Sequence, residues 1–298
     1  MKRGKLVLLV LISLVSLTGL ASAVEFNYWM AGTSAPDVAK FNSSWWDLSG
    51  KTDSPAYGIY SGTYTDDYFF LGGGNSEFTL YNGTFERYSQ SESPFKNSVD
   101  GLSSNSTHVY IGTAQPNNYL FNISSKSFTD LGAQPDSSSI ETVTDSYGAD
   151  IGGDYFLIGT QQPSVWKWNG SFYDISPGFF VNTIGASDRN STHIMVGDTG
   201  GVIGLYNGSN WTDISSKLGF EGNDKIFAIE HGNFGGESFW LVGGTNGRIE
   251  RLWVNGTSED LSGELPGSWE INSIGFNDEK NRFHVGGASG NISIYKEN

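Results

Sequence analysis

Short apolar runs that end in glycine recur along the chain and dominate its hydrophobic pattern. They occupy residues 28–32, 68–73, 108–112, 155–159, 193–197, 239–244 and 282–287. Each run is apolar at odd and even positions alike, as in a strand whose two faces are both buried. The runs follow one another at a period of about 40 residues, which is typical of a repeat architecture. We name the strand predicted at each run strand B.

Three further segments surround each strand B. Segments of the form apolar-x-x-apolar precede it and predict strand A, at 56–59, 99–102, 140–143, 181–184, 226–229 and 271–274. A third strand follows a short Gly- or Pro-containing loop and predicts strand C, at 37–41, 77–81, 118–121, 164–168, 202–206, 248–254 and 291–295. In four copies strand C runs into Asn-Gly, the preferred pair for a two-residue hairpin. Alternating segments such as WTDIS (211–215) then predict strand D.

Four antiparallel strands per unit, one of them buried on both faces, describe the blade of a β-propeller. We therefore predict an all-β fold, a single propeller domain over residues 24–298. Its repeats span approximately 24–50, 56–90, 97–133, 139–177, 181–218, 225–265 and 270–298. The first unit begins at strand B and the last ends after strand C. The prediction is seven blades with incomplete blades at the seam, and the alternative is a six-bladed ring with one merged seam blade.

Two local patterns resemble known propeller families. A Gly pair after an apolar strand followed by an aromatic residue and Trp, as in 241–253, resembles the kelch blade. The Asn-Gly-Ser-x-Trp turn at 207–211 is similar to a shortened Asp-box of sialidase-type propellers. The resemblance implies a propeller over nearly all of residues 25–298 and implies no particular function.

The N-terminal residues predict export. Lys2, Arg3 and Lys5 precede an apolar run that ends near Ala21-Ser-Ala23, the order of a secretory signal. We expect cleavage after Ala23, no transmembrane span in the mature chain, and a secreted or cell-surface protein. The chain carries a net charge of -15, which becomes -18 when the three basic residues leave. Such a charge argues against nucleic acid as a partner. The absence of Cys excludes disulfides and thiolate chemistry.

The sequence offers no convincing catalytic set. Strand D repeats an aspartate in five units, at Asp47, Asp130, Asp174, Asp213 and Asp260, and this recurrence indicates a carboxylate that caps a turn. Channel-lining positions of strand A would supply catalytic groups if there were an enzyme, and the residues are Glu230, His231 and Asp145. A carbohydrate-active hydrolase or lyase is therefore the alternative interpretation, and a non-enzymatic role is preferred. No cofactor or metal site is predicted.

The loops that enter strand A and the loops that join strands B and C share one face of a propeller. The entering loops carry aromatic residues beside Pro or Gly, namely Tyr57, Phe95, Phe179, Phe180, Phe220 and Trp269. The B–C loops add amides and acids, namely Asp37, Gln115, Asn117, Gln161, Gln162, Asp198 and Asn246. Aromatic faces beside amides suit sugars or peptides. The alternative is that the aromatic side chains fill the gaps between blades.

Ten glycan-acceptor sequons are present, at Asn42, Asn82, Asn105, Asn122, Asn169, Asn190, Asn207, Asn210, Asn255 and Asn291. Most fall in C–D or A–B turns on the opposite face, where turn chemistry alone enriches Asn-Gly-Ser/Thr. The leading hypothesis is a non-catalytic binding module for a glycan, a peptide or an envelope protein. A purely structural envelope component is the third interpretation, and the sequence does not fix the oligomeric state.

Overall fold

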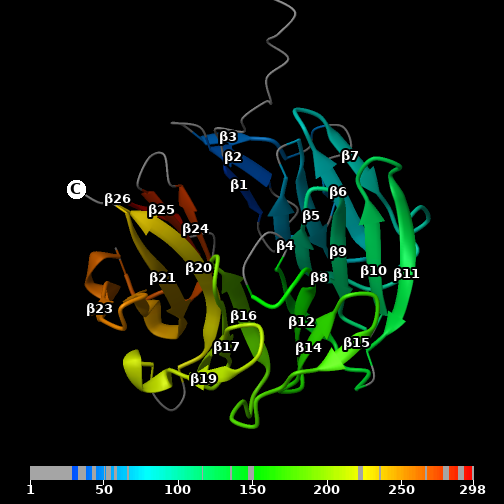
Figure 1. Ribbon diagram of the computed structural model, residues 1–298. Helices are drawn as coiled ribbons and strands as arrows, with labels where there is room; N and C mark the ends of the chain where they lie inside the picture. The colour runs from blue at the N-terminus through cyan, green and yellow to red at the C-terminus, as the bar shows by residue number, and fades with distance from the viewer. Residues whose placement is uncertain are drawn as a thin grey trace, which may run out of the picture.

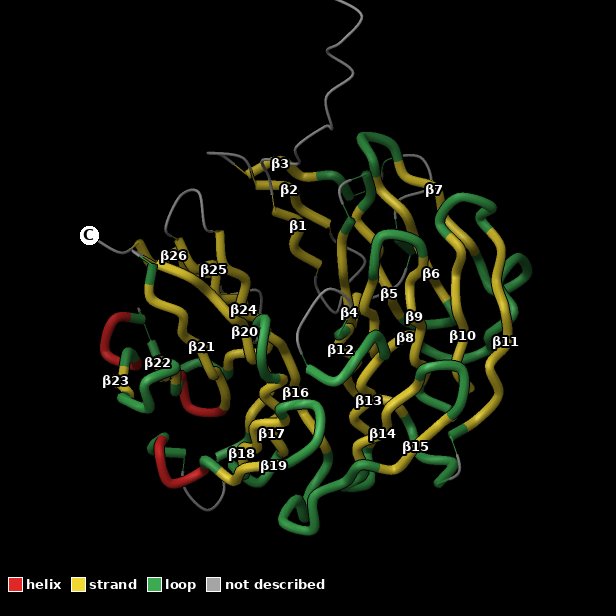
Figure 2. Tube along the Cα trace, in the orientation of Figure 1, coloured by secondary structure: helices red, strands yellow, loops and turns green. Residues whose placement is uncertain are grey.

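The computed structural model describes residues 29–32, 38–41, 45–49, 51, 55–56, 59–65, 67–115, 117–134, 136–146, 151–220, 224–234, 236–265, 267–277, 282–287 and 292–296. These residues form seven antiparallel sheets, five of four strands and two of three, arranged around a central axis (Figure 1). Within each sheet the strands lie in chain order, as expected of consecutive hairpins. In this part of the chain the structured segments are strands apart from three short 3-10 helices, and none of the helices is long and apolar enough to cross a membrane (Figure 2).

The first three sheets contain β1 to β11. Their bounds are Trp29–Gly32, Val38–Phe41 and Trp45–Asp47 for β1 to β3, Ile59–Tyr64, Phe69–Gly73, Glu77–Tyr81 and Phe85–Tyr88 for β4 to β7, and Val99–Ser104, His108–Thr113, Asn117–Asn122 and Ser127–Ala133 for β8 to β11.

The remaining sheets contain β12 to β26. Their bounds are Ile140–Asp145, Phe156–Thr160, Val165–Trp168 and Phe172–Asp174 for β12 to β15, Ile184–Arg189, Ile194–Asp198, Ile203–Tyr206 and Trp211–Asp213 for β16 to β19, Ile226–Phe234, Glu237–Gly244, Ile249–Trp253 and Ser258–Asp260 for β20 to β23, and Ile271–Asn277, Arg282–Gly287 and Ile292–Lys296 for β24 to β26. The helices η1, η2 and η3 span Ser215–Lys217, Thr245–Gly247 and Ser262–Glu264.

Six sheets have an innermost strand that faces the axis, and these strands are β4, β8, β12, β16, β20 and β24. Consecutive members of this series contact one another, so the six sheets are successive blades. The seventh sheet, β1–β3, lies between β24–β26 and β4 in Figure 1, and among the described residues it has no such strand. The prediction of seven blades is therefore corrected to six. Counting B–C pairs gives one blade too many because the described part of the first unit begins at strand B.

The seam differs from the merged blade that the six-bladed alternative assumed. β3 pairs with β2, within its own hairpin. Leu48, which follows β3, packs against Leu71, Tyr81 and Phe85 of the β4–β7 blade. The β1–β3 sheet thus keeps the side-by-side packing of a blade, although its described strands include no channel-lining strand.

Strand B is buried on both faces, as predicted. Every residue of β13 and β17 is buried, whereas the outer strands β15 and β19 are mostly exposed. Glycine recurs near the end of strand B for a steric reason. A Cβ on Gly197 would lie 2.7 Å from Cγ2 of Ile226, the first residue of the next innermost strand. The same contact joins Gly72 to Val99, Gly112 to Ile140, Gly159 to Ile184, and Gly243 to Ile271.

The repeated aspartate of strand D caps a turn, as predicted. Asp213 Oδ1 accepts hydrogen bonds from the backbone N–H of Ser215 at 2.9 Å and from its hydroxyl at 2.6 Å. The Ser215 hydroxyl oxygen in turn accepts the N–H of Ile203 at 3.0 Å, at the start of β18. Ser176 and Ser262 make the same contacts to strand C in their own blades. This Asp-x-Ser turn therefore closes the C–D hairpin.

Two predicted innermost strands begin later than expected. The predicted segments 56–59 and 181–184 become strand only from Ile59 and Ile184 onward. Val181 is 68% exposed, and its N–H donates to the Asp198 carboxylate in the loop that enters the strand. The apolar-x-x-apolar spacing misplaced these two strands because its first apolar residue belongs to the entering loop.

Candidate functional site

The six innermost strands enclose a cavity of about 670 Å³ along the axis. It is lined by segments of all six strands, 60–64, 100–104, 141–144, 185–189, 227–231 and 272–274. This volume lies within the range of ligand pockets. Its lining is mainly polar or small, in contrast to the apolar clusters between blades.

One residue in each innermost strand is left out of the pairing with strand B. The register shifts past the second residue of β4, β8, β12, β16, β20 and β24. These bulge residues are Tyr60, Asp100, Glu141, Gly185, Phe227 and Asn272, and all of them line the cavity. A bulge re-aims the side chain that it carries, which is why bulges are common beside binding sites. We call this set the bulge ring.

The bulge ring lies at the channel mouth beside the entering and B–C loops. In the β4–β5 pair, Ile59 is opposite Gly73 at the end of strand B, and Tyr60 follows it directly. The residue before each bulge is Ile or Val in every blade, whereas the bulge residue differs in every blade. The scaffold therefore fixes the first position and leaves the second position to vary in chemistry.

Asp100 and Glu141 are neighbours in the bulge ring. Burial raises the pKa of the Asp100 carboxyl, and a hydrogen bond from Ser98 acts in the opposite direction. Burial likewise raises the pKa of the Glu141 carboxyl, and the negative charge of Asp100 adds to this rise. Both carboxylates are therefore partly desolvated and repel one another.

The other end of the channel holds two of the residues considered for catalysis. His231 donates its backbone N–H to Asp188 Oδ2 at 2.5 Å. Its Nε2 lies 2.7 Å from Ser238 Oγ, and its ring packs edge-on against Trp240. These contacts hold the imidazole against its own sheet, while Glu230 lines the channel beside it. Asp145 ends β12, and its side chain lies outside the described residues.

The aromatic residues predicted for the ligand face divide into two groups. Phe95, Phe180 and Phe220 are buried in the clusters between blades, at 1%, 4% and 5% exposure. Phe179 and Trp269 are half-buried against the same kind of cluster. Their placement matches the interpretation in which entering-loop aromatics fill the gaps between blades. Tyr57 lies outside the described residues.

The predicted amides lie on the surface, but Asp198, one of the two predicted acids, does not. Gln115, Gln161, Gln162 and Asn246 are exposed in the B–C loops, and Asn117 is exposed as the first residue of β10. In contrast, Asp198 is fully buried. Its Oδ2 accepts the N–H groups of Val181 and Asn182, and its Oδ1 accepts those of Gly200 and Val202. Asp198 thus holds the entering loop to the B–C loop. Asp37 lies outside the described residues.

Two other carboxylates that hold entering loops were missed at the sequence level. Glu250 is 3% exposed, and its two oxygens lie 2.8 and 2.9 Å from the N–H donor of Gly219. Glu77 accepts the N–H of Ala56 in the same way, at 2.8 and 2.9 Å. Their signal was an acid beside an apolar residue in strand C, because such an acid needs a hydrogen-bonding or ionic partner when it is buried.

The described sequons act as turn residues. Asn82, Asn169, Asn207, Asn210 and Asn255 are exposed, Asn105 and Asn122 are half-buried, and Asn190 is buried. Asn190 Oδ1 accepts the N–H groups of Thr192 and His193, and Asn105 makes the same bonds to Thr107 and His108. Asn42 and Asn291 lie outside the described residues.

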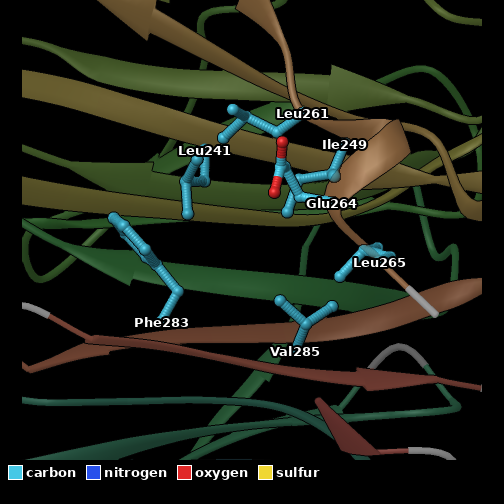
Figure 3. A pocket seen from close by; sticks show the side chains of 7 residues that line it. All are labelled: Leu241, Ile249, Leu261, Glu264, Leu265, Phe283 and Val285. Carbon is cyan, nitrogen blue, oxygen red and sulfur yellow. The ribbon is translucent and has the colours of Figure 1, made fainter. Parts of the chain in front are cut away.

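A small void lies between the last two blades and is lined by Leu241, Ile249, Leu261, Glu264, Leu265, Phe283 and Val285 (Figure 3). Its volume of about 10 Å³ is at most that of one water molecule. It is therefore a packing defect and holds no organic ligand. Among the described residues, no group of three His, Cys, Asp or Glu side chains is placed to hold a metal ion.

Solved structures share this fold. The WD40 β-propeller domain of Doa1 superimposes with a TM-score of 0.74 at 14% identity, covering 93% of this chain and 91% of that chain. The RRP9 WD40 repeats match with a TM-score of 0.68 at 10% identity, covering 88% and 84%. The computationally designed Ika8 protein matches with a TM-score of 0.64 at 13% identity, covering 91% and 93%.

No family model and no curated protein sequence matches the chain. At such low identities the structural matches show the fold alone, an all-β propeller with four-stranded antiparallel blades. The kelch and Asp-box resemblance is not specifically supported by these matches, two of which are WD40 propellers. Function has to be argued from the site.

Proposed function

We propose that this chain is a non-catalytic interaction module that binds a segment of a protein partner at the channel mouth. The observation that carries the proposal is the bulge ring. Its six positions are structurally equivalent, yet they hold Tyr, Asp, Glu, Gly, Phe and Asn in turn. A position that serves the scaffold would hold the same type of residue in every blade, as the preceding Ile or Val does. A position that binds a ligand holds a residue whose chemistry matches the ligand.

The composition of the mouth supports binding of a polypeptide. Tyr60 is 56% exposed and Phe227 is half-buried, so both rings offer apolar surface to a partner. The exposed amides of Gln115 and Gln161 stand on the adjoining B–C loops, and the exposed amide of Asn117 stands at the start of β10. Aromatic anchors with polar groups around them are the usual composition of a protein-binding surface. The N-terminal signal pattern further supports an exported protein.

The test begins with selection of short random peptides on the wild-type protein. The selected peptides are then titrated against Tyr60→Ala and Phe227→Ala, with Tyr173→Ala as the matched control, because Tyr173 is 53% exposed on the outer strand β15. We expect the two mouth variants to lose more than about tenfold in affinity, equivalent to about 1.4 kcal/mol. The control should bind as the wild type does. If no peptide is selected, or if all variants bind equally, the mouth is not a peptide site.

A further inference from the structure

We propose that the channel mouth recognises a basic side chain, an arginine or lysine of the protein partner, held between the ring of Tyr60 and the carboxylates of Asp100 and Glu141. The inference rests on the proposed function and adds the chemistry of the residue that the partner must present.

The backbone of two adjacent blades brings the carboxylates together. Asp100 and Glu141 occupy the bulges of β8 and β12, which contact one another along the channel. A Cβ on Gly101 would lie 3.0 Å from Val143 Cγ2 and 3.3 Å from the carbonyl carbon of Thr142. The strands approach this closely one residue after each bulge, so the two acids enter the cavity side by side.

The two acids have no cationic partner within the described chain. The ion pairs there join Glu77 to Arg87, Glu86 to Lys126, Asp224 and Glu250 to Arg248, and Glu259 to Arg251. The basic side chain among the cavity-lining residues is Arg189, which pairs with Ile194 at the opposite end of its strand. Two partly desolvated carboxylates without a counter-ion are stabilised when a cation arrives from outside.

The rest of the bulge ring suits a long cationic side chain. Tyr60 precedes Asp100 around the ring, and its exposed ring can receive a guanidinium or ammonium group by a cation–π contact. Gly185 follows Glu141 and adds no side chain, because the carbonyl of Ile226 occupies the place of its Cβ. Gly185 thus brings no side chain between Glu141 and Phe227, and the Phe227 ring offers apolar surface that can cover the stem of the entering residue.

The net negative charge of the whole molecule also favours a basic segment of a partner. A net charge of -15 attracts a basic segment before contact and orients its approach. A channel mouth with two acids and low-dielectric walls concentrates this field at the bulge ring.

The test uses the peptides selected on the wild-type protein, each paired with a copy in which Arg and Lys are replaced by Gln. Binding is measured to the wild type, Asp100→Asn and Glu141→Gln. The matched controls are Asp154→Asn and Glu237→Gln, two exposed acids outside the channel. We expect the Gln copies to bind the wild-type protein roughly tenfold or more weakly than the original peptides do. We expect the original peptides to lose a similar factor in affinity on each bulge-ring variant. The control variants should change binding by less than about twofold.

The outcomes separate this inference from the proposed function. If the Gln copies bind as well as the originals while Tyr60→Ala still weakens them, the mouth binds peptides and the basic-residue inference is wrong. If Tyr60→Ala has no effect, the proposed function itself fails. Titration with calcium chloride distinguishes a simple cation site. Calcium binding that Asp100→Asn abolishes, with no preference among the peptides, would overturn the inference.

Discussion

A methyl group placed on Gly197 would lie 2.7 Å from Cγ2 and 3.2 Å from Cβ of Ile226. Gly197 lies in the fully buried strand β17, and the fully buried Ile226 begins the innermost strand of the next blade. Because this contact recurs at five junctions, it sets how closely neighbouring blades pack. The glycine is therefore required by the next blade and not by a turn.

Gly197→Ala should lower the free energy of unfolding by about 1–3 kcal/mol, because the added methyl group overpacks a buried junction. The measurement is equilibrium denaturation in urea. In an Ile226→Ala background the same substitution should cost much less, because the obstructing side chain is gone. Gly178→Ala is the control, since a Cβ there meets no atom within 4 Å. Equal costs in both backgrounds would contradict the steric explanation.

The buried Glu250 carboxylate is expected to be essential for holding its entering loop. Glu250→Gln removes one acceptor oxygen facing Gly219 and the charge that pairs with Arg248 at 2.7 Å. We predict a loss of about 1–3 kcal/mol in unfolding free energy, the usual cost when a buried hydrogen-bonding group loses its partner. Glu259→Gln, at the half-exposed partner of Arg251, should cost less than about 1 kcal/mol in the same denaturation assay. Similar losses in the two variants would argue against a special role for Glu250.

The Asp-x-Ser turn can be tested at Ser215. Ser215→Ala leaves the N–H of Ile203 without its hydroxyl acceptor and removes one donor from Asp213. A loss of about 1–2 kcal/mol is expected by thermal or chemical denaturation. Ser215→Thr keeps the hydroxyl and should retain most of the stability, and the exposed neighbour Ser216 supplies the control Ser216→Ala. If Ser215→Ala and Ser216→Ala are equally harmless, the hydroxyl does not stabilise the hairpin.

The acidic pair of the bulge ring predicts an unusual pH dependence of stability. Burial raises the pKa of Asp100 and of Glu141, so the folded state binds protons more readily than the unfolded state. Their ionisation opposes folding at neutral pH, and this penalty disappears as the pH falls through the raised values toward the ordinary values of 3.8 and 4.5. The Asp100→Asn, Glu141→Gln double variant should therefore melt a few degrees above the wild type near neutral pH.

The advantage of the double variant should shrink as the pH approaches about 4.5, and differential scanning calorimetry at several pH values measures it. Asp188, Arg189, Glu230 and His231, at the other end of the channel, are present in both proteins. The double variant Asp154→Asn, Glu237→Gln is the control for the loss of two charges. A difference from the wild type that stays constant with pH would contradict the assignment.

The repeat pattern predicted the local structure well because it reports local physics. The two-faced burial of β13 and β17 follows from an unbroken apolar run, and the turn role of Asp213 follows from its recurrence. The count of blades was wrong because a B–C hairpin looks the same whether or not a channel-lining strand precedes it. The buried position of Asp198 was missed because a carboxylate in a loop normally faces water.

The candidate site was likewise predicted only in part from the sequence. The sequence predicts a ligand face at the entering and B–C loops, and two of the aromatic residues it names there, Phe95 and Phe180, pack between blades. Tyr60 and Asp100 gave no signal, because Tyr60 follows the predicted segment 56–59 and Asp100 lies inside the predicted strand 99–102. In the structure each residue occupies the register shift of its strand and lines the channel.

The sequence by itself determined the strands, the hairpins and the repeat, because backbone conformation and hydrophobic alternation are encoded within each unit of about 40 residues. The tertiary structure alone decided which residues meet. Ring formation sets Ile226 against Gly197 and places Asp100 beside Glu141, pairs about 30 to 40 residues apart whose contact depends on the packing of whole blades. The chemistry of the mouth therefore arises between blades, where no single repeat contains it.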